Sequence, residues 1–138
     1  MLINVLCIGD VVGNPGRTVV SERLPALIKK YDLEFVVCNG ENAAGGSGIT
    51  PAIYNALLDA GVDVITMGDH VFRRKQAYEI LGNSERIVRP ANLPPSSVGR
   101  GWTVLDSGNI HCSIAVISLI GQLNISSVQA DSPWLKFS

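Results

Sequence analysis

Three short apolar runs in this chain each end in a glycine that is followed at once by a carboxylate. The runs and their polar ends are 5–8 with Gly9 and Asp10, 35–38 with Gly40 and Glu41, and 64–67 with Gly68 and Asp69. Runs of this length are typical of buried strands. The carboxyl ends of parallel strands lie side by side at one edge of a sheet, where ligands bind. We therefore expect the three carboxylates to converge, with Glu41 between the other two.

The order of the remaining patterns predicts an α/β fold. We expect strands at 2–8, 35–38, 62–67 and 87–88, helices at 17–30, 50–60 and 72–81, and a β-hairpin of 102–105 with 110–119. Thr50 and Pro51 resemble a helix N-cap followed by a first-turn proline, and Pro25 predicts a kink or break in the first helix. This order predicts a mostly parallel sheet with right-handed crossovers plus an antiparallel addition.

The bulk properties exclude several classes of function. A length of 138 residues suits one domain, 1–138. The net charge of -1 gives no support for nonspecific nucleic-acid binding. There is no apolar run near the ~20 residues that span a bilayer and no leader peptide, so we expect no membrane association and a cytoplasmic location. Cys7, Cys38 and Cys112 lie in or beside apolar runs, which favours buried, reduced thiols.

The converging acids predict a cation site. Like charges disfavour each other's ionisation, so a bound cation, or a pair of cations, is the simplest counter-charge. Hard oxygen ligands suit Mg²⁺, Mn²⁺ or Fe, and Asn42 could add a neutral oxygen. Two such ions a few ångströms apart activate water and stabilise the leaving oxygen of a phosphoester. One glycine–aspartate step alone would be an ordinary turn.

His70 has two competing functional interpretations, besides a structural one. It could ligate the metal, or lie just outside it and donate a proton to the leaving alkoxide. Since Asp69 next to it already offers a ligand, we favour the proton donor. His111 begins an apolar strand with no acidic neighbour and is interpreted as structural.

Other polar segments keep two interpretations each. The loop 9–16 precedes a helix but matches neither phosphate-binding glycine motif. The glycine-rich loop 45–48 could admit a substrate or simply be flexible. Arg89 and Asn92 could meet a phosphate or ribose, or be structural. The basic run 73–75 could attract phosphate, or form a solvated helix face.

Four motifs together resemble a known family: 9–17, 39–44, 65–70 and 89–92. The chain is similar to the small bacterial branch of the calcineurin-like metallophosphoesterases, whose studied members hydrolyse 2′,3′-cyclic nucleotides. The resemblance covers residues 1 to about 120, with a weaker echo at 131–134. It implies a sandwich of two sheets flanked by helices. It also implies a dinuclear metal site in which Asp10 and Glu41 are ligands, with Glu41 bridging.

By the same resemblance Asn42 lies beside the metals, Asp69 occupies a ligand position and His70 is the catalytic proton donor. The family usually has asparagine where this chain has Asp69, which adds negative charge. Family members are also about twice as long, and their second half supplies several histidine ligands. The chain therefore resembles an N-terminal half, truncated after about residue 120.

We accordingly expect a metal-dependent phosphodiesterase acting on small phosphodiesters, most simply 2′,3′-cyclic nucleotides. Two divalent ions would hold a bridging hydroxide that attacks phosphorus, and His70 would protonate the leaving oxygen. One alternative is an inactive fragment that needs a partner or the missing half. Another is a nucleotide-binding regulatory module without hydrolysis. The apolar strand 114–119, left without neighbours, predicts self-association into a homo-oligomer.

Overall fold

A computed structural model describes residues 2–107 and 112–136. The strands are β1 (Val5–Asp10), β2 (Phe35–Asn39), β3 (Val64–Thr66), β4 (Ile87–Val88), β5 (Trp102–Ser107) and β6 (Cys112–Ile117). The helices are α1 (Gly13–Tyr31), α2 (Pro51–Asp59) and α3 (Ala77–Asn83), and a 3₁₀ turn, η1, covers Pro133–Lys136. The predicted order of strands and helices is confirmed.

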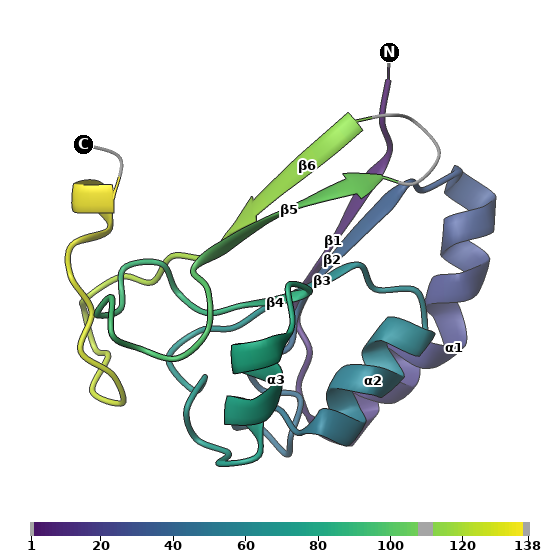
Figure 1. Ribbon diagram of the computed structural model, residues 1–138. Coiled ribbons are helices and arrows are strands. Elements are labelled where there is room, and N and C mark those ends of the chain that lie inside the picture. Colours follow the sequence, from purple (N-terminus) through teal and green to yellow (C-terminus); the bar gives the residue numbers. More distant parts are fainter. Residues whose placement is uncertain (1, 108–111, 137–138) are drawn as a thin grey trace.

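The strands form two sheets that face each other. The first is parallel in the order β1-β2-β3-β4, and the second is the antiparallel hairpin β5-β6. A parallel bridge between Pro90 and Ser118 continues β4 toward the end of the hairpin. Figure 1 shows α1, α2 and α3 on one side of the parallel sheet and the hairpin on the other. The fold is therefore a mixed α/β sandwich, as predicted.

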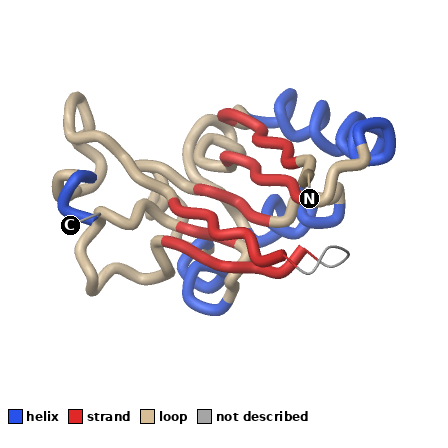
Figure 2. Tube along the Cα trace, turned by 90° about the horizontal axis from the view of Figure 1, so that it is seen from above, coloured by secondary structure: helices blue, strands red, loops and turns tan. Residues whose placement is uncertain are grey.

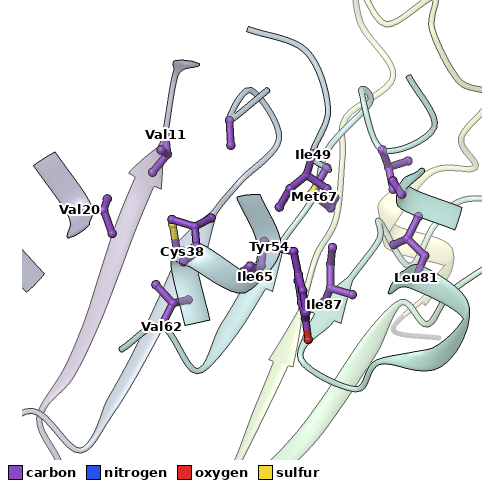
Figure 3. Close-up of a cluster of buried hydrophobic side chains, with 14 of the residues drawn as sticks. Val11, Val20, Cys38, Ile49, Tyr54, Val62, Ile65, Met67, Leu81 and Ile87 are labelled. Carbon is purple, nitrogen blue, oxygen red and sulfur yellow. The ribbon is translucent and has the colours of Figure 1, made fainter. Parts of the chain in front are cut away.

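The two faces of the central strands are buried against different layers. Val36, Cys38, Ile65 and Ile87 belong to the cluster on the helix side, where Figure 3 shows several of them together. Their sequence neighbours Phe35, Val64 and Val88 pack instead against Val116 of the hairpin. Because strand side chains alternate between faces, continuous apolar runs are needed where both faces are covered. This explains why β2 and β3 read as unbroken apolar runs.

The edge strand β1 is covered on one face only. Leu6 and Ile8 pack toward the helices, whereas Val5 and Cys7 on the other face are exposed. The prediction that Cys7 is buried was therefore wrong, because the hairpin lies over β2 to β4 and does not reach β1. Cys38 is buried, and burial raises the pKa of its thiol to about 12.

Several element boundaries differ from the sequence prediction. Helix α1 begins at Gly13 and passes through Pro25 without a break. Helix α3 begins only at Ala77, because residues 69–76 form turns, and it includes Gly82 and Asn83. The N-cap was correct: the amide of Ile53 donates to the Thr50 hydroxyl over 3.4 Å.

The chain beyond β6 is mostly loop. Figure 2 shows the segment after the hairpin running as loop to the short turn η1. Residues 108–111, with the predicted structural His111 and the start of the predicted strand 110–119, lie outside the described residues. None of the described helices is both long enough and apolar enough to cross a membrane.

Candidate metal site

The loops at the carboxyl ends of β1, β2 and β3 bring the predicted residues together. A register shift between Ile8 and Asp10 puts Asp10 opposite Asn39 at the end of β2. The Asn39 side chain then accepts from the amide of Glu41 over 2.9 Å, which sets the turn that presents Glu41 and Asn42. Asp69 and His70 come three and four residues after Thr66, the last residue of β3. The predicted convergence at this sheet edge is what the structure shows.

Glu41, Asp69 and His70 form the tightest group. One ligand atom from each lies within 4.8 Å of the others, and all three side chains are partly buried. Nδ1 of His70 is 3.7 Å from Oε1 of Glu41, and its Nε2 is 3.7 Å from Oδ2 of Asp69. Two carboxylates and one imidazole are a donor set that fits Mn²⁺, Fe or Zn²⁺.

Asp10 joins this group through Asn42. The amide nitrogen of Asn42 donates to both oxygens of Asp10, over 3.0 and 2.8 Å, while its oxygen lies 2.8 Å from Nδ1 of His70. A carboxylate can only accept, so the amide must turn its nitrogen to Asp10 and its oxygen to His70. Nδ1 of His70 then carries the hydrogen that it donates to Asn42. Nε2 is left as the imidazole atom available for proton transfer.

The close approach of Glu41 and Asp69 favours protonation of Glu41 over protonation of Asp69. Burial, followed by the hydrogen bond to Asp69 and the charge of Asp69, raises the pKa of Glu41 to about 7. The hydrogen bond from Glu41 holds the pKa of Asp69 below its usual value. As the pH falls, Glu41 therefore takes up a proton before Asp69 does. A divalent cation between the two carboxylates would favour the ionised form of both.

Gly68 makes room for this arrangement. A Cβ atom at position 68 would lie 1.7 Å from Oε2 of Glu41 and 2.3 Å from its carboxyl carbon. The carboxylate of Glu41 therefore lies directly over the backbone between β3 and Asp69. The glycine that precedes Asp69 is thus required by close packing of the Glu41 side chain, rather than by a turn conformation.

Two arginines hold the loop that follows Glu41 and Asn42. Arg17 donates to the carbonyl oxygen of Ala43. Arg74 donates from Nε to Ser47 over 3.0 Å and from Nη2 to Ala44 over 2.8 Å, in each case to the backbone oxygen. Arg74 is thus engaged with the glycine-rich loop, instead of lying on a purely solvated face.

Arg89 and Asn92 lie in the interior and bind the backbone. Arg89 donates to Gly99 and Pro90, and Asn92 is 0% exposed. Of their two interpretations, the structure favours the structural one.

Ser127 was missed by sequence reasoning. Its hydroxyl donates a hydrogen bond to Oδ2 of Asp69 from 58 residues further along the chain. It lies in a segment without periodicity, so no local pattern marks it.

Comparisons with known proteins show the family of the chain. The model of the YmdB-like protein family matches residues 6–138. The chain belongs to this family. The predicted resemblance is thereby confirmed.

A curated relative, the 2′,3′-cyclic-nucleotide 2′-phosphodiesterase of Bacillus subtilis strain 168, is 41% identical over 134 residues, which are 97% of this chain and 49% of the relative. Two solved structures are also similar. One is a hypothetical protein from Thermus thermophilus, with a TM-score of 0.86 and 36% identity, covering 96% of this chain and 50% of that one. The other is a novel phosphatase from Mycoplasma pneumoniae, with a TM-score of 0.88 and 30% identity, covering 98% and 49%. The chain spans about half the length of each of these three proteins.

Proposed function

We propose that this chain carries the acidic, metal-binding half of a phosphodiesterase that acts on small phosphodiesters, with 2′,3′-cyclic nucleotides as the substrate class. The observation that carries the proposal is the group of Glu41, Asp69 and His70, whose ligand atoms lie within 4.8 Å of one another. The phosphodiesterase name of the Bacillus subtilis relative supports the substrate class. A cytoplasmic location stays a prediction from the sequence.

The residues have distinct roles in this proposal. Glu41 and Asp69 hold the cation, with Asp10 and Asn42 as the neighbouring donors, and two ions are expected from the family resemblance. When bound, the metal would supply charge neutralisation and an activated water at the phosphorus. Glu41 and Asp69 with their neighbours leave coordination positions open, so a complete two-ion site needs further ligands.

His70 is placed to donate a proton. Its Nδ1 hydrogen is held by Asn42, whose amide is fixed in turn by Asp10. Nε2 of the protonated imidazole would pass its proton to the departing ribose oxygen, which leaves the ring neutral. The imidazole is 28% exposed, so a substrate bound above the carboxylates can reach it.

The first test is hydrolysis of 2′,3′-cyclic AMP by the chain with added Mn²⁺ and with EDTA. Turnover that EDTA abolishes would mean that this half suffices or is completed by self-association. A second candidate is a half enzyme that is active only with a partner that completes the site. The chain matches only 49% of the Bacillus subtilis relative, which favours this candidate. It predicts no turnover by the chain alone.

A chimera tests both candidates together. Residues 1–136 of this chain replace the matching half of the Bacillus subtilis relative, and the chimera is assayed with Mn²⁺. We expect metal-dependent hydrolysis, with a fall of ~10²–10⁴-fold in kcat for His70→Gln and near-complete loss for Asp10→Ala or Glu41→Ala. A folded, metal-loaded chimera that does not hydrolyse the substrate, or full activity in these variants, would refute the proposal.

A further inference from the structure

A loop of residues 120–131 is closed at its base by one buried side chain. The amide nitrogen of Asn92 donates to the carbonyl oxygens of Ile120 and Asp131, each over 2.8 Å, and its oxygen accepts from the amide of Ile120 over 3.1 Å. The amide of Asp131 also donates to the backbone oxygen of Asn92 over 2.8 Å. Both ends of the loop are thus fixed to one point in the interior.

The body of this loop is docked against the core next to the site. Ile120, Val128 and Ala130 are partly buried and pack against the helix-side cluster. The side chain of Gln122 donates across the loop to the oxygen of Ala130 over 3.1 Å. Just before the loop, the Ser118 hydroxyl donates to the backbone oxygen of Met67, two residues before Asp69, over 2.8 Å.

The loop contacts the site through Ser127. Its hydroxyl donates to Oδ2 of Asp69, and the same carboxyl lies in the group with Glu41 and His70. The side chain of Asp69 is 27% exposed. The hydroxyl of Ser127 is therefore a donor placed to fix the rotation of the Asp69 carboxylate.

We propose that Ser127 is a positioning residue of the metal site that acts through Asp69. The loop 120–131, closed by Asn92, holds Ser127 next to Asp69. The inference rests on the proposed function, because it requires that Asp69 ligates a cation. Hydrogen bonds to ligating carboxylates orient them, and loss of such a partner typically lowers metal affinity by ~10–100-fold. The donor comes from a distant loop, so the local sequence around Asp69 does not encode it.

The test is Mn²⁺ affinity, measured by calorimetry and by the electron paramagnetic resonance signal of free Mn²⁺, in the whole chain. We expect Ser127→Ala to weaken binding by ~10-fold or more. The adjacent, exposed Ser126 gives a matched control, and Ser126→Ala should bind within about threefold of the parent. Ser127→Thr keeps a hydroxyl and should restore most of the affinity.

The outcomes separate this inference from the proposed function. If the parent chain binds Mn²⁺ and Ser127→Ala binds it equally well, the positioning role is refuted while the metal site stands. The role is also refuted if Ser126→Ala loses as much affinity, or if Ser127→Thr does not recover it. If the parent chain shows no saturable Mn²⁺ binding, the proposed site itself fails, and the inference fails with it. Without metal, all variants should have the same unfolding temperature as the parent chain. A general loss of structure would lower that temperature.

Discussion

At the scale of single residues, Gly9 and Gly68 form a natural pair. Each lies near the carboxyl end of a strand and precedes an aspartate. Only Gly68 is crowded: a Cβ there would lie 1.7 Å from Glu41, whereas nothing lies within 4 Å of a Cβ at Gly9. Close packing therefore explains the glycine before Asp69, but it does not explain the glycine before Asp10.

We predict that Gly68→Ala weakens Mn²⁺ binding by more than about tenfold, because the new methyl group must displace the carboxylate of Glu41 from the group. Gly9→Ala is the control and should bind within about threefold of the parent. Calorimetric titration of both variants checks this. Equal affinities in the two variants would show that the position of Glu41 over Gly68 is unimportant for the cation.

A second residue-scale prediction concerns pH. The pKa of Glu41 is raised to about 7, so below that pH a growing fraction of the group carries a proton that must leave before it can ligate. The pKa of Asp69 is lowered, first by its hydrogen bond with Glu41, so Asp69 takes up a proton only at lower pH than Glu41 does. Mn²⁺ affinity should therefore rise by up to ~tenfold per pH unit toward pH 7 and level off above it.

Calorimetric Mn²⁺ titrations at several pH values, in buffers of different ionisation enthalpy, measure how many protons are released when the cation binds. The same pH dependence should persist in His70→Gln, because the proton belongs to Glu41. An affinity that does not change with pH on the acid side of the Glu41 pKa, or a step that disappears with His70, would contradict this assignment.

At the scale of elements, the sequence predicted those features that are determined by neighbouring residues in the chain. The apolar runs, the Thr50 cap and the acids after β1, β2 and β3 are local patterns, and they were predicted correctly. The delayed start of α3 was not, because the turn 69–76 is held by long-range contacts such as that of Arg74 with the glycine-rich loop.

Ser127 was missed at the site because it, too, depends on long-range contacts. Ser127 reaches Asp69 only because Asn92 closes a loop 28 to 39 residues further along the chain. How far the hairpin extends across the parallel sheet also decided the exposure of Cys7. No pattern within a strand or helix encodes either fact.

The glycine-rich loop gives a prediction at this scale. Arg74→Ala removes two hydrogen bonds to the loop and should lower the free energy of unfolding by ~1–2 kcal/mol. Hydrogen exchange of residues 43–48 should speed up at the same time. Arg73→Ala, at the exposed neighbouring position, should change stability by no more than ~0.5 kcal/mol. Unchanged exchange in Arg74→Ala would show that the loop is held by other contacts.

At the scale of the whole molecule, the outer face of the hairpin is apolar and uncovered. Trp102 pairs with Ile117, and Val104 with Ala115; the first three of these side chains are 61%, 45% and 48% exposed, respectively. The strand 114–119 was expected to cause self-association, but Ile114 and Val116 face the parallel sheet. The apolar surface therefore lies on the alternate residues of the hairpin.

We predict concentration-dependent self-association through this outer face, because exposed apolar patches favour association. Sedimentation of the chain should show it, and Ile117→Lys should shift the equilibrium toward monomer. Val19→Lys, at a valine of α1 that is 60% exposed, is the control and should leave it unchanged. A monomer at high concentration would refute self-association through the hairpin.

The most direct test of the central claim is a Mn²⁺ titration of this chain on the alkaline side of the Glu41 pKa, with Glu41→Gln and the exposed-surface control Glu22→Gln beside it. We expect saturable binding by the parent chain and by Glu22→Gln, reversed by EDTA, and at least ~tenfold weaker affinity in Glu41→Gln. Saturable binding that is unaffected by Glu41→Gln, or no saturable binding by the parent chain, would contradict a metal site at the ends of β1, β2 and β3.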